Sequence, residues 1–194
     1  RVIAAYLPLP WEADITPVIR ELLAQKKYAE AMEVLEAAQL IIPAHELLTA
    51  QTEKVKEATP TYLLDVSAAY DSVGYEEYTG EKTFSIQNEA YSNGFTLCGG
   101  GYVCYNISAK YTLLSMTMGH LDDSNRINGA VDIYLDGELA QSIFMGVEDP
   151  VQLLELDITG VRQLRIEVIP TDAGDEPGAA GEGLHWGFAE VSVS

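Results

Sequence analysis

The hydrophobic period of the sequence changes once, near residue 61, and this change constrains the fold more than any other feature. Beyond it, apolar and polar residues alternate over short stretches, most clearly in residues 131–135, 164–168 and 189–193. Such alternation is typical of a β-strand with one face in a core and the other in water. Residues 14–58 instead carry apolar side chains at a helical spacing. We therefore expect a small helical segment followed by a larger β domain.

Turn signals separate the predicted strands. They are Asn93-Gly94, Asn128-Gly129, Asp136-Gly137 and Thr159-Gly160. Dipeptides of this kind favour tight turns, and Asp136-Gly137, which lies between two alternating stretches, is the strongest hairpin signal. About nine or ten strands with no helical pattern between them predict an antiparallel β-sandwich.

The helical segment has its own start and stop signals. Thr16-Pro17 predicts a helix start, with a hydroxyl cap and proline at the first position. The run from Glu21 to Ala38 resembles one tetratricopeptide unit, but a single copy is too short for a repeat array. Pro43 predicts a break before a third, weaker helix, and Pro60 predicts its end.

These patterns divide the chain into a helical stalk or hairpin, residues 1–60, and a sandwich domain, residues 61–194. The net charge of −19 is uneven, because residues 1–59 hold 9 acids and 6 bases whereas residues 60–194 hold 21 acids and 5 bases. A surface this acidic repels nucleic acid and anionic membranes, which makes both poor candidates as partners. It suits an extracellular or cell-surface protein that must stay soluble.

The sequence contains no apolar run long enough for a transmembrane helix and no signal peptide. It begins with Arg1 rather than Met, so we expect a fragment or a processed form. A membrane tether or an export signal would then lie outside this sequence.

The two cysteines, Cys98 and Cys104, flank a triple glycine. Strand-like residues on both sides allow the pair to face each other across a hairpin, where a disulfide would form in an exported protein. Two free thiols on strands are the alternative. Zinc is disfavoured because no further ligands lie at the usual spacing.

Several segments of the sandwich, in the right order, resemble the NPCBM family of carbohydrate-binding modules. The hairpin Val131–Leu139 resembles its V-x-(I/V)-Y-x-D-G-K-L pattern, and Gly119–Asp123 resembles a short glycine-to-aspartate loop of the family. The other similar segments are Phe84–Ile86, Tyr91–Leu97, Tyr105–Ile107, Lys110–Leu113, Leu156–Ile166 and Gly187–Val191. The resemblance covers about residues 61–194. It implies a jelly-roll sandwich of the galactose-binding type and non-catalytic sugar binding, usually in exported bacterial envelope or glycan-degrading proteins.

The polar loop of residues 119–128 is one candidate site. His120, Asp122 and Asn125, together with Asp123 and Arg126, supply the hydrogen-bonding groups that a sugar site needs. The alternative is a solvated connection in which Asp and Asn serve turn chemistry. Asp122 is also a candidate ligand for a structural calcium ion, since hard cations take oxygen ligands, although the chain has no EF-hand pattern.

The start of the last predicted strand is the second candidate site. Trp186 offers a flat apolar face for stacking on a sugar ring, and His185 and Glu182 offer hydrogen bonds. The resemblance adds that family members often carry an aromatic residue or a His-Asp-Trp segment at this position. The alternative is a tryptophan that packs under the edge of the sandwich with the histidine as its cap.

Catalysis is not expected. The chain has three histidines and contains no Gly-x-Ser-x-Gly elbow, phosphate loop or His-Glu-x-x-His helix. Asp122 and Asp123 are adjacent, which in a strand sends them to opposite faces and suits a two-carboxylate glycosidase poorly. The sequence thus favours a carbohydrate-binding module without a cofactor. The alternative is a structural or protein–protein interaction module of a cell-surface protein, and a metal-dependent enzyme is a distant third.

Overall fold

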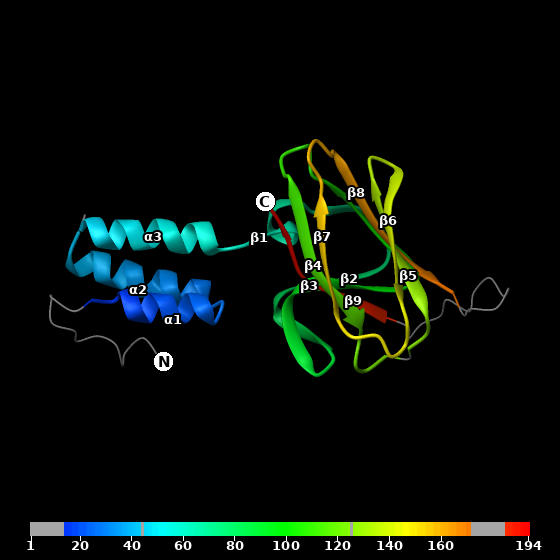
Figure 1. Cartoon of the computed structure of the whole chain (residues 1–194), viewed down its shortest axis with the longest axis horizontal. Coiled ribbons are helices and arrows are strands. Elements are labelled where there is room, and N and C mark those ends of the chain that lie inside the picture. The colour runs from blue at the N-terminus through cyan, green and yellow to red at the C-terminus, as the bar shows by residue number, and fades with distance from the viewer. Residues whose placement is uncertain (1–13, 44, 125, 172–184) are drawn as a thin grey trace. The chain divides into compact units, whose positions relative to one another are not determined.

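The computed structural model describes residues 14–43, 45–124, 126–171 and 185–194 (Figure 1). The chain divides into two compact units, Arg1–Pro60 and Thr61–Ser194. The first contains helices and the second is mostly β.

The first unit contains α1 (Thr16–Ala24), α2 (Tyr28–Ile41) and α3 (Glu46–Ala58). Its small core consists of Ile19, Ala31, Leu35, Leu48 and Val55. Pro17 lies in the first turn as predicted, but the cap differs from the prediction. The hydroxyl of Thr16 does not cap the helix. The backbone N–H of Thr16 instead donates to the carboxylate of Asp14. Within the described ranges, no helix is both long and apolar enough to span a bilayer.

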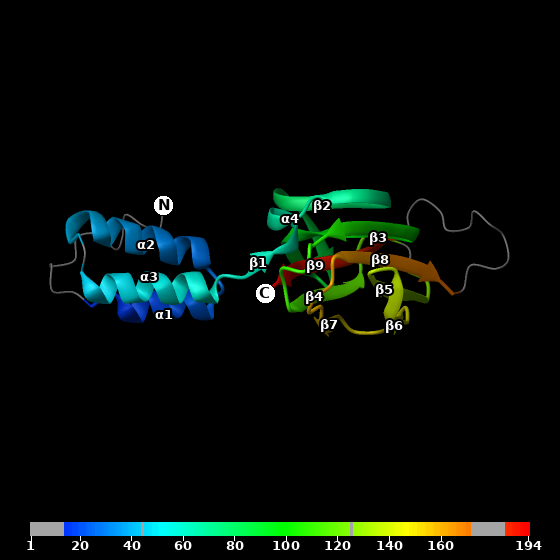
Figure 2. The same ribbon diagram turned by 90° about the horizontal axis from the view of Figure 1, so that it is seen from above.

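The second unit is an antiparallel β-sandwich, which confirms the predicted fold class. Its elements are β1 (Thr61–Tyr62), α4 (Leu63–Val66), β2 (Ala69–Ile86), β3 (Glu89–Asn106), β4 (Leu113–His120), β5 (Gly129–Leu135), β6 (Glu138–Met145), β7 (Gln152–Asp157), β8 (Gln163–Pro170) and β9 (His185–Val193). They form one curled sheet in the order β6-β5-β8-β3-β9-β4-β7, with β2 paired to β3 and β1 to β9 (Figure 2).

Strand β3 joins the two layers of the sandwich. Its first half pairs with β9 through Gly94–Cys98, and its second half pairs with β8 through Tyr102–Asn106. The glycines 99–101 lie where the strand passes from one layer to the other. The expected hairpin between the two cysteines is therefore wrong, because Cys98 and Cys104 lie six residues apart on one strand, beyond the reach of a disulfide. Both thiols are free.

Inward-facing residues of the alternating strands fill the space between the layers. They include Phe95, Leu97, Tyr105, Leu114, Met116, Ile133, Leu164, Ile166, Trp186 and Phe188. Asp136-Gly137 forms the β5–β6 turn with positive φ at both residues, so this hairpin is confirmed.

The predicted turn at Asn93-Gly94 is wrong, because both residues lie inside β3. Gly94 is needed there for another reason. A Cβ at this position would lie 2.1 Å from the carbonyl oxygen of Phe188 on β9, so only glycine allows the two backbones to approach. The β2–β3 turn is Gln87–Asn88, where both residues have positive φ without being glycine.

Candidate functional site

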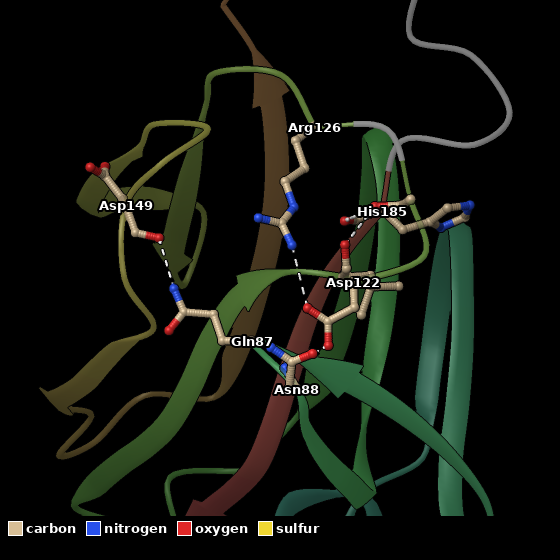
Figure 3. Close-up of polar contacts among 8 residues, drawn as sticks. Gln87, Asn88, Asp122, Arg126, Asp149 and His185 are labelled. Carbon is tan, nitrogen blue, oxygen red and sulfur yellow. Dashed lines mark hydrogen bonds and ion pairs between the residues drawn. The ribbon is translucent and has the colours of Figure 1, made fainter.

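Four segments meet at one end of the sandwich and form a polar rim. They are the β2–β3 turn with Gln87 and Asn88, the β4–β5 loop at residues 121–124 and 126–128, the β6–β7 loop over residues 146–151, and His185 at the start of β9. Hydrogen bonds cross between them, so the segments hold one another (Figure 3). We call this surface the rim.

Asp122 is the central residue of the rim. Its backbone N–H donates to the carbonyl of Ser85 at 3.0 Å, next to the isolated antiparallel bridge between Ile86 and Leu121. One carboxylate oxygen accepts the backbone N–H of Asn88 at 2.7 Å, and the other accepts Nη2 of Arg126 at 3.3 Å. Asp122 thus fixes the β2–β3 turn and positions the one guanidinium among the described rim residues.

The β6–β7 loop closes the other side of the rim. Gln87 donates its side-chain amide to the carbonyl of Asp149 at 3.2 Å, and the carboxylate of Asp149 accepts the N–H of Gly146 at 2.6 Å. Val147 donates its N–H to the side-chain oxygen of Asn128 at 2.9 Å. These bonds stabilise the loop. The side chains of Arg126 and Asp122 remain partly exposed to solvent.

Trp186 does not lie on the rim surface, which contradicts its predicted role as a stacking platform. It is 1% exposed and belongs to the sandwich core. The physical reason is its position on β9, an inner strand between β3 and β4, where Trp186 pairs with Leu97 and His120. Its ring packs so closely that a Cβ on Gly129 would lie 3.0 Å from it.

His120 is buried as well, so its predicted direct contact with a ligand is wrong in this structure. It is the last residue of β4, is 6% exposed, and its ring centroid lies 5.2 Å from that of Trp186. Within the described part of the chain, neither ring nitrogen of His120 has a hydrogen-bond partner, and the same holds for Nε1 of Trp186.

The surroundings of His120 favour the neutral imidazole. Burial lowers its pKa below the usual 6.5, and the positive charge of Arg126 lowers it further. The backbone of Gly146 and Met145 and the carboxylate of Asp149 act in the opposite direction but do not outweigh burial.

His185 lies at the rim and is half-buried. Its backbone carbonyl accepts the N–H of Leu121 at 3.3 Å and the hydroxyl of Ser124 at 3.3 Å, whereas its imidazole points away from Asp122 and Arg126 in Figure 3. Asn125 and Glu182, also predicted as ligand contacts, lie outside the described residues. The structure therefore brings Asp122 and His185 to the rim and places His120 and Trp186 beneath it.

Phe144 is a candidate that sequence reasoning missed. It lies next to the end of β6, one residue before Met145, and is 58% exposed. Phe144 on β6 and Ile169 on β8 both pair with Ala130 on β5, and Ile169 is also exposed. The alternation in β6 carried the signal, because an inward Ile143 puts Phe144 on the solvent face.

The rim offers hydrogen-bond donors and acceptors rather than a catalytic constellation. A carboxylate accepts about four hydrogen bonds and a guanidinium donates about five, so Asp122 and Arg126 keep capacity for a ligand. Among the described residues, no group of three or more His, Cys, Asp or Glu side chains is arranged to hold a metal ion. Both carboxylate oxygens of Asp122 already have partners, and a calcium ion at this residue remains an untested prediction.

Several solved structures similar to this chain contain CBM51 modules. The CBM51 of a GH95 protein of Clostridium perfringens, in complex with methyl-galactose, has a TM-score of 0.54 at 17% identity, covering 70% of this chain and 100% of that one. The CBM51-2 and INT domains of ZmpB from the same organism have a TM-score of 0.55 at 17% identity, covering 69% of this chain and 31% of that one.

Tandem CBM51 modules of Sp3GH98 from Streptococcus pneumoniae SP3-BS71 have a TM-score of 0.54 at 10% identity, covering 69% of this chain and 46% of that one. At these identities the likeness shows the fold alone. The chain spans less than a third of the length of the ZmpB structure. No curated protein matches the sequence.

The family profile for the NPCBM/NEW2 domain matches residues 49–192. The match covers the whole sandwich except its last two residues and reaches back into α3. The chain belongs to the NPCBM/NEW2 domain family.

Proposed function

We propose that the sandwich is a non-catalytic carbohydrate-binding module that binds a neutral glycan at the rim, as part of an exported bacterial envelope or glycan-degrading protein. The proposal rests on the rim of this NPCBM/NEW2 sandwich. Its central side chains, Asp122 and Arg126, are paired with each other and remain partly exposed. Solved structures of this fold include a complex with methyl-galactose and one with GlcNAc.

The chemistry of the rim fits a sugar. Hydroxyl groups both donate and accept, so adjacent hydroxyls pair well with a carboxylate and a guanidinium fixed side by side. The described rim also carries exposed acids at Asp123, Glu148 and Asp149. Because like charges repel, this surface disfavours a glycan that carries carboxylates or sulfates. Phe144 replaces Trp186 as the candidate for stacking on the apolar face of a sugar ring.

Isothermal titration of the full chain with methyl-galactoside and with N-acetylglucosamine tests the proposal. Trp186 fluorescence is a poor readout, because the indole does not reach the surface. We expect saturable binding in the millimolar to micromolar range, which corresponds to about −4 to −8 kcal/mol. Absence of heat for these sugars and for a panel of neutral glycans would contradict the proposal.

Matched variants locate the site. Arg126→Ala is expected to weaken binding about 10-fold or more, the loss that follows from removing a charged hydrogen-bond donor. Arg162→Ala, at the opposite end of the sandwich, is the control and should leave binding unchanged. Phe144→Ala should weaken binding, whereas Leu139→Ala, with 54% exposure at the far end of the same strand, should not. Equal losses in both members of a pair would place the site elsewhere.

A second candidate function is supported by the helical unit. The end of α2 exposes the large aliphatic side chains of Leu40 and Ile41, and the start of α3 exposes Leu47. Clustered exposed apolar residues mark interaction surfaces more often than chance. We propose that, if the sandwich binds no sugar, this end of the helical unit mediates assembly with another protein chain.

Light scattering of the full chain tests this second proposal. A stable oligomer that Leu40→Ser/Leu47→Ser converts to a monomer, in a protein without glycan binding, would support it. A monomer at all concentrations would contradict self-assembly. The substitutions replace exposed residues, so the helical core of Ile19, Leu35 and Val55 should remain intact.

A further inference from the structure

His120 lies directly beneath the rim and is used by none of the proposed ligand contacts. It ends β4, two residues before Asp122, and its ring lies against the indole of Trp186 with an interplanar angle of 46°. Both of its ring nitrogens are buried, and neither makes a well-aligned hydrogen bond within the described ranges. The nearby backbone of Gly146 and Met145 favours the protonated ring but does not outweigh burial. A buried imidazole without partners is tolerated only while it is neutral, because burying an unpaired charge costs far more.

The charged groups around His120 make protonation unfavourable. Arg126, from the β4–β5 loop, adds a like charge. Asp149, from the β6–β7 loop, is the opposing carboxylate, but it already accepts the N–H of Gly146. β9 contributes Trp186, which carries no charge. A proton on His120 would therefore repel Arg126, the cation that Asp122 binds.

We propose that His120 makes the rim sensitive to mild acid: its protonation displaces Arg126 from Asp122 and loosens the hold of Asp122 on the β2–β3 turn. The 3.3 Å contact of Arg126 with Asp122 and the 2.7 Å contact of Asn88 with Asp122 share one carboxylate, so a change at the first is transmitted to the second. Ligand binding at the rim weakens as a consequence, and this last step rests on the proposed function.

Histidine ring-proton NMR of the full chain, between ~pH 8 and ~pH 5, tests the proposal. His120 is expected to titrate below the usual histidine pKa of 6.5. The protection of the Asn88 amide, corrected for the intrinsic pH dependence of exchange, is expected to fall as His120 takes up its proton. A His120 that titrates with a pKa at or above 6.5, or an Asn88 amide that stays protected throughout, would overturn the proposal.

Variants separate His120 from the other titrating groups. His120→Phe keeps a ring against Trp186 and should abolish the acid-induced exchange at Asn88, with His120→Gln as a second variant if the first does not fold. His185→Gln, at the rim but half-buried, is the matched control and should leave the effect intact. If acid exposes Asn88 equally in His120→Phe and in the wild type, another group is responsible and the proposal is wrong.

Glycan titration in the same pH range distinguishes the two proposals. Affinity is expected to fall by up to ~10-fold per pH unit once His120 titrates, and to stay constant in His120→Phe. If Asn88 responds to acid but no glycan binds at any pH, the proposed function fails and the proton-sensitive rim stands. If glycan affinity is the same at both ends of the range in the wild type, the coupling of His120 to the rim is wrong.

Discussion

At each end of the sandwich an aspartate carboxylate accepts backbone N–H groups from another segment, but the surroundings of the two carboxylates differ. At the end opposite the rim, the carboxylate of Asp136 accepts the backbone N–H groups of Arg162 and Gln163 and ties the β5–β6 turn to the start of β8. At the rim, Asp122 ties the β2–β3 turn to the β4–β5 loop in the same way.

The rim has two features that the opposite end lacks among the described residues: a bound guanidinium and buried nitrogen atoms without partners. Asp122 also binds Arg126, and beneath it lie three buried nitrogen atoms, on His120 and Trp186, without partners in the described ranges. Unsatisfied buried polar groups are rare and costly in stable proteins, at about 1–3 kcal/mol each. The opposite end is thus built for stability, and the rim keeps features that stability alone does not explain.

The largest expected effect tests whether Trp186 is structural. Trp186→Ala should lower the free energy of unfolding by about 3–5 kcal/mol, because it empties a large volume in the core. Ile158→Ala, at a fully buried position of the opposite end, should cost about 2–5 kcal/mol. Denaturant unfolding measures both. Trp186→Phe should lower the free energy of unfolding by less and leave glycan affinity unchanged. A loss of affinity in a folded Trp186→Phe would show that the indole takes part in ligand binding.

The two carboxylates should separate stability from binding. Asp136→Ala leaves two backbone N–H groups without their acceptor, whereas Asp122→Ala leaves one backbone N–H and the guanidinium of Arg126. Each substitution should cost about 1–2 kcal/mol of stability. Only Asp122→Ala should also weaken glycan binding, by about 10-fold or more. Thermal unfolding and calorimetric titration on the same samples give both quantities. Comparable losses of affinity in the two variants would remove the distinction between the ends.

The two hairpin turns sharpen the comparison at a smaller scale. Gly137 has φ +88°, and Gly137→Ala should cost about 1 kcal/mol because an alanine is strained in this conformation. Asn88 holds φ +64° without being glycine, so Asn88→Gly should be neutral or stabilise by a few tenths of a kcal/mol. Unfolding curves of the two variants check the opposite signs, and a destabilised Asn88→Gly would show that its side chain is needed at the rim.

The acid responses of the two ends should differ. The hydrogen bonds of Thr159 hold the pKa of Asp157, at the opposite end, below 3.8. Its stabilising contribution is present above 3.8 and is lost as the pH falls through the lower folded value. The pKa of buried His120 is lowered from 6.5, so its contribution is present above 6.5 and is lost as the pH falls below it. Protection of the amide from exchange should therefore be lost at Asn88 in milder acid than at Thr159, and the reverse order would contradict the comparison.

The sequence predicted the fold because its information is local and redundant. Alternation in β4, β5, β8 and β9 defines the inner faces, and Asp136-Gly137 fixes one hairpin. The turn predicted at Asn93-Gly94 was wrong, because Gly94 is required by the close approach of the Phe188 backbone on another strand. No local sequence pattern reveals such an approach.

The candidate site was harder to predict, because its residues meet only in three dimensions. A Trp-containing segment at the start of a strand gives no indication of whether that strand is an edge or an inner one, and β9 lies between β3 and β4. The pairing of Asp122 with the N–H of Asn88 spans 34 positions of sequence. The alternation in β6 indicates that Phe144 faces solvent, but exposure alone does not distinguish a ligand contact from an ordinary surface residue.

The central claim is that a glycan binds at the rim, and two-dimensional amide NMR of the full chain during titration with methyl-galactoside tests it most directly. We predict saturable shifts at Gln87, Asn88, Asp122 and Arg126, with Asp136 and Gln163 at the opposite end unchanged. Shifts confined to the opposite end, or none at saturating concentrations of this sugar and of N-acetylglucosamine, would contradict the account.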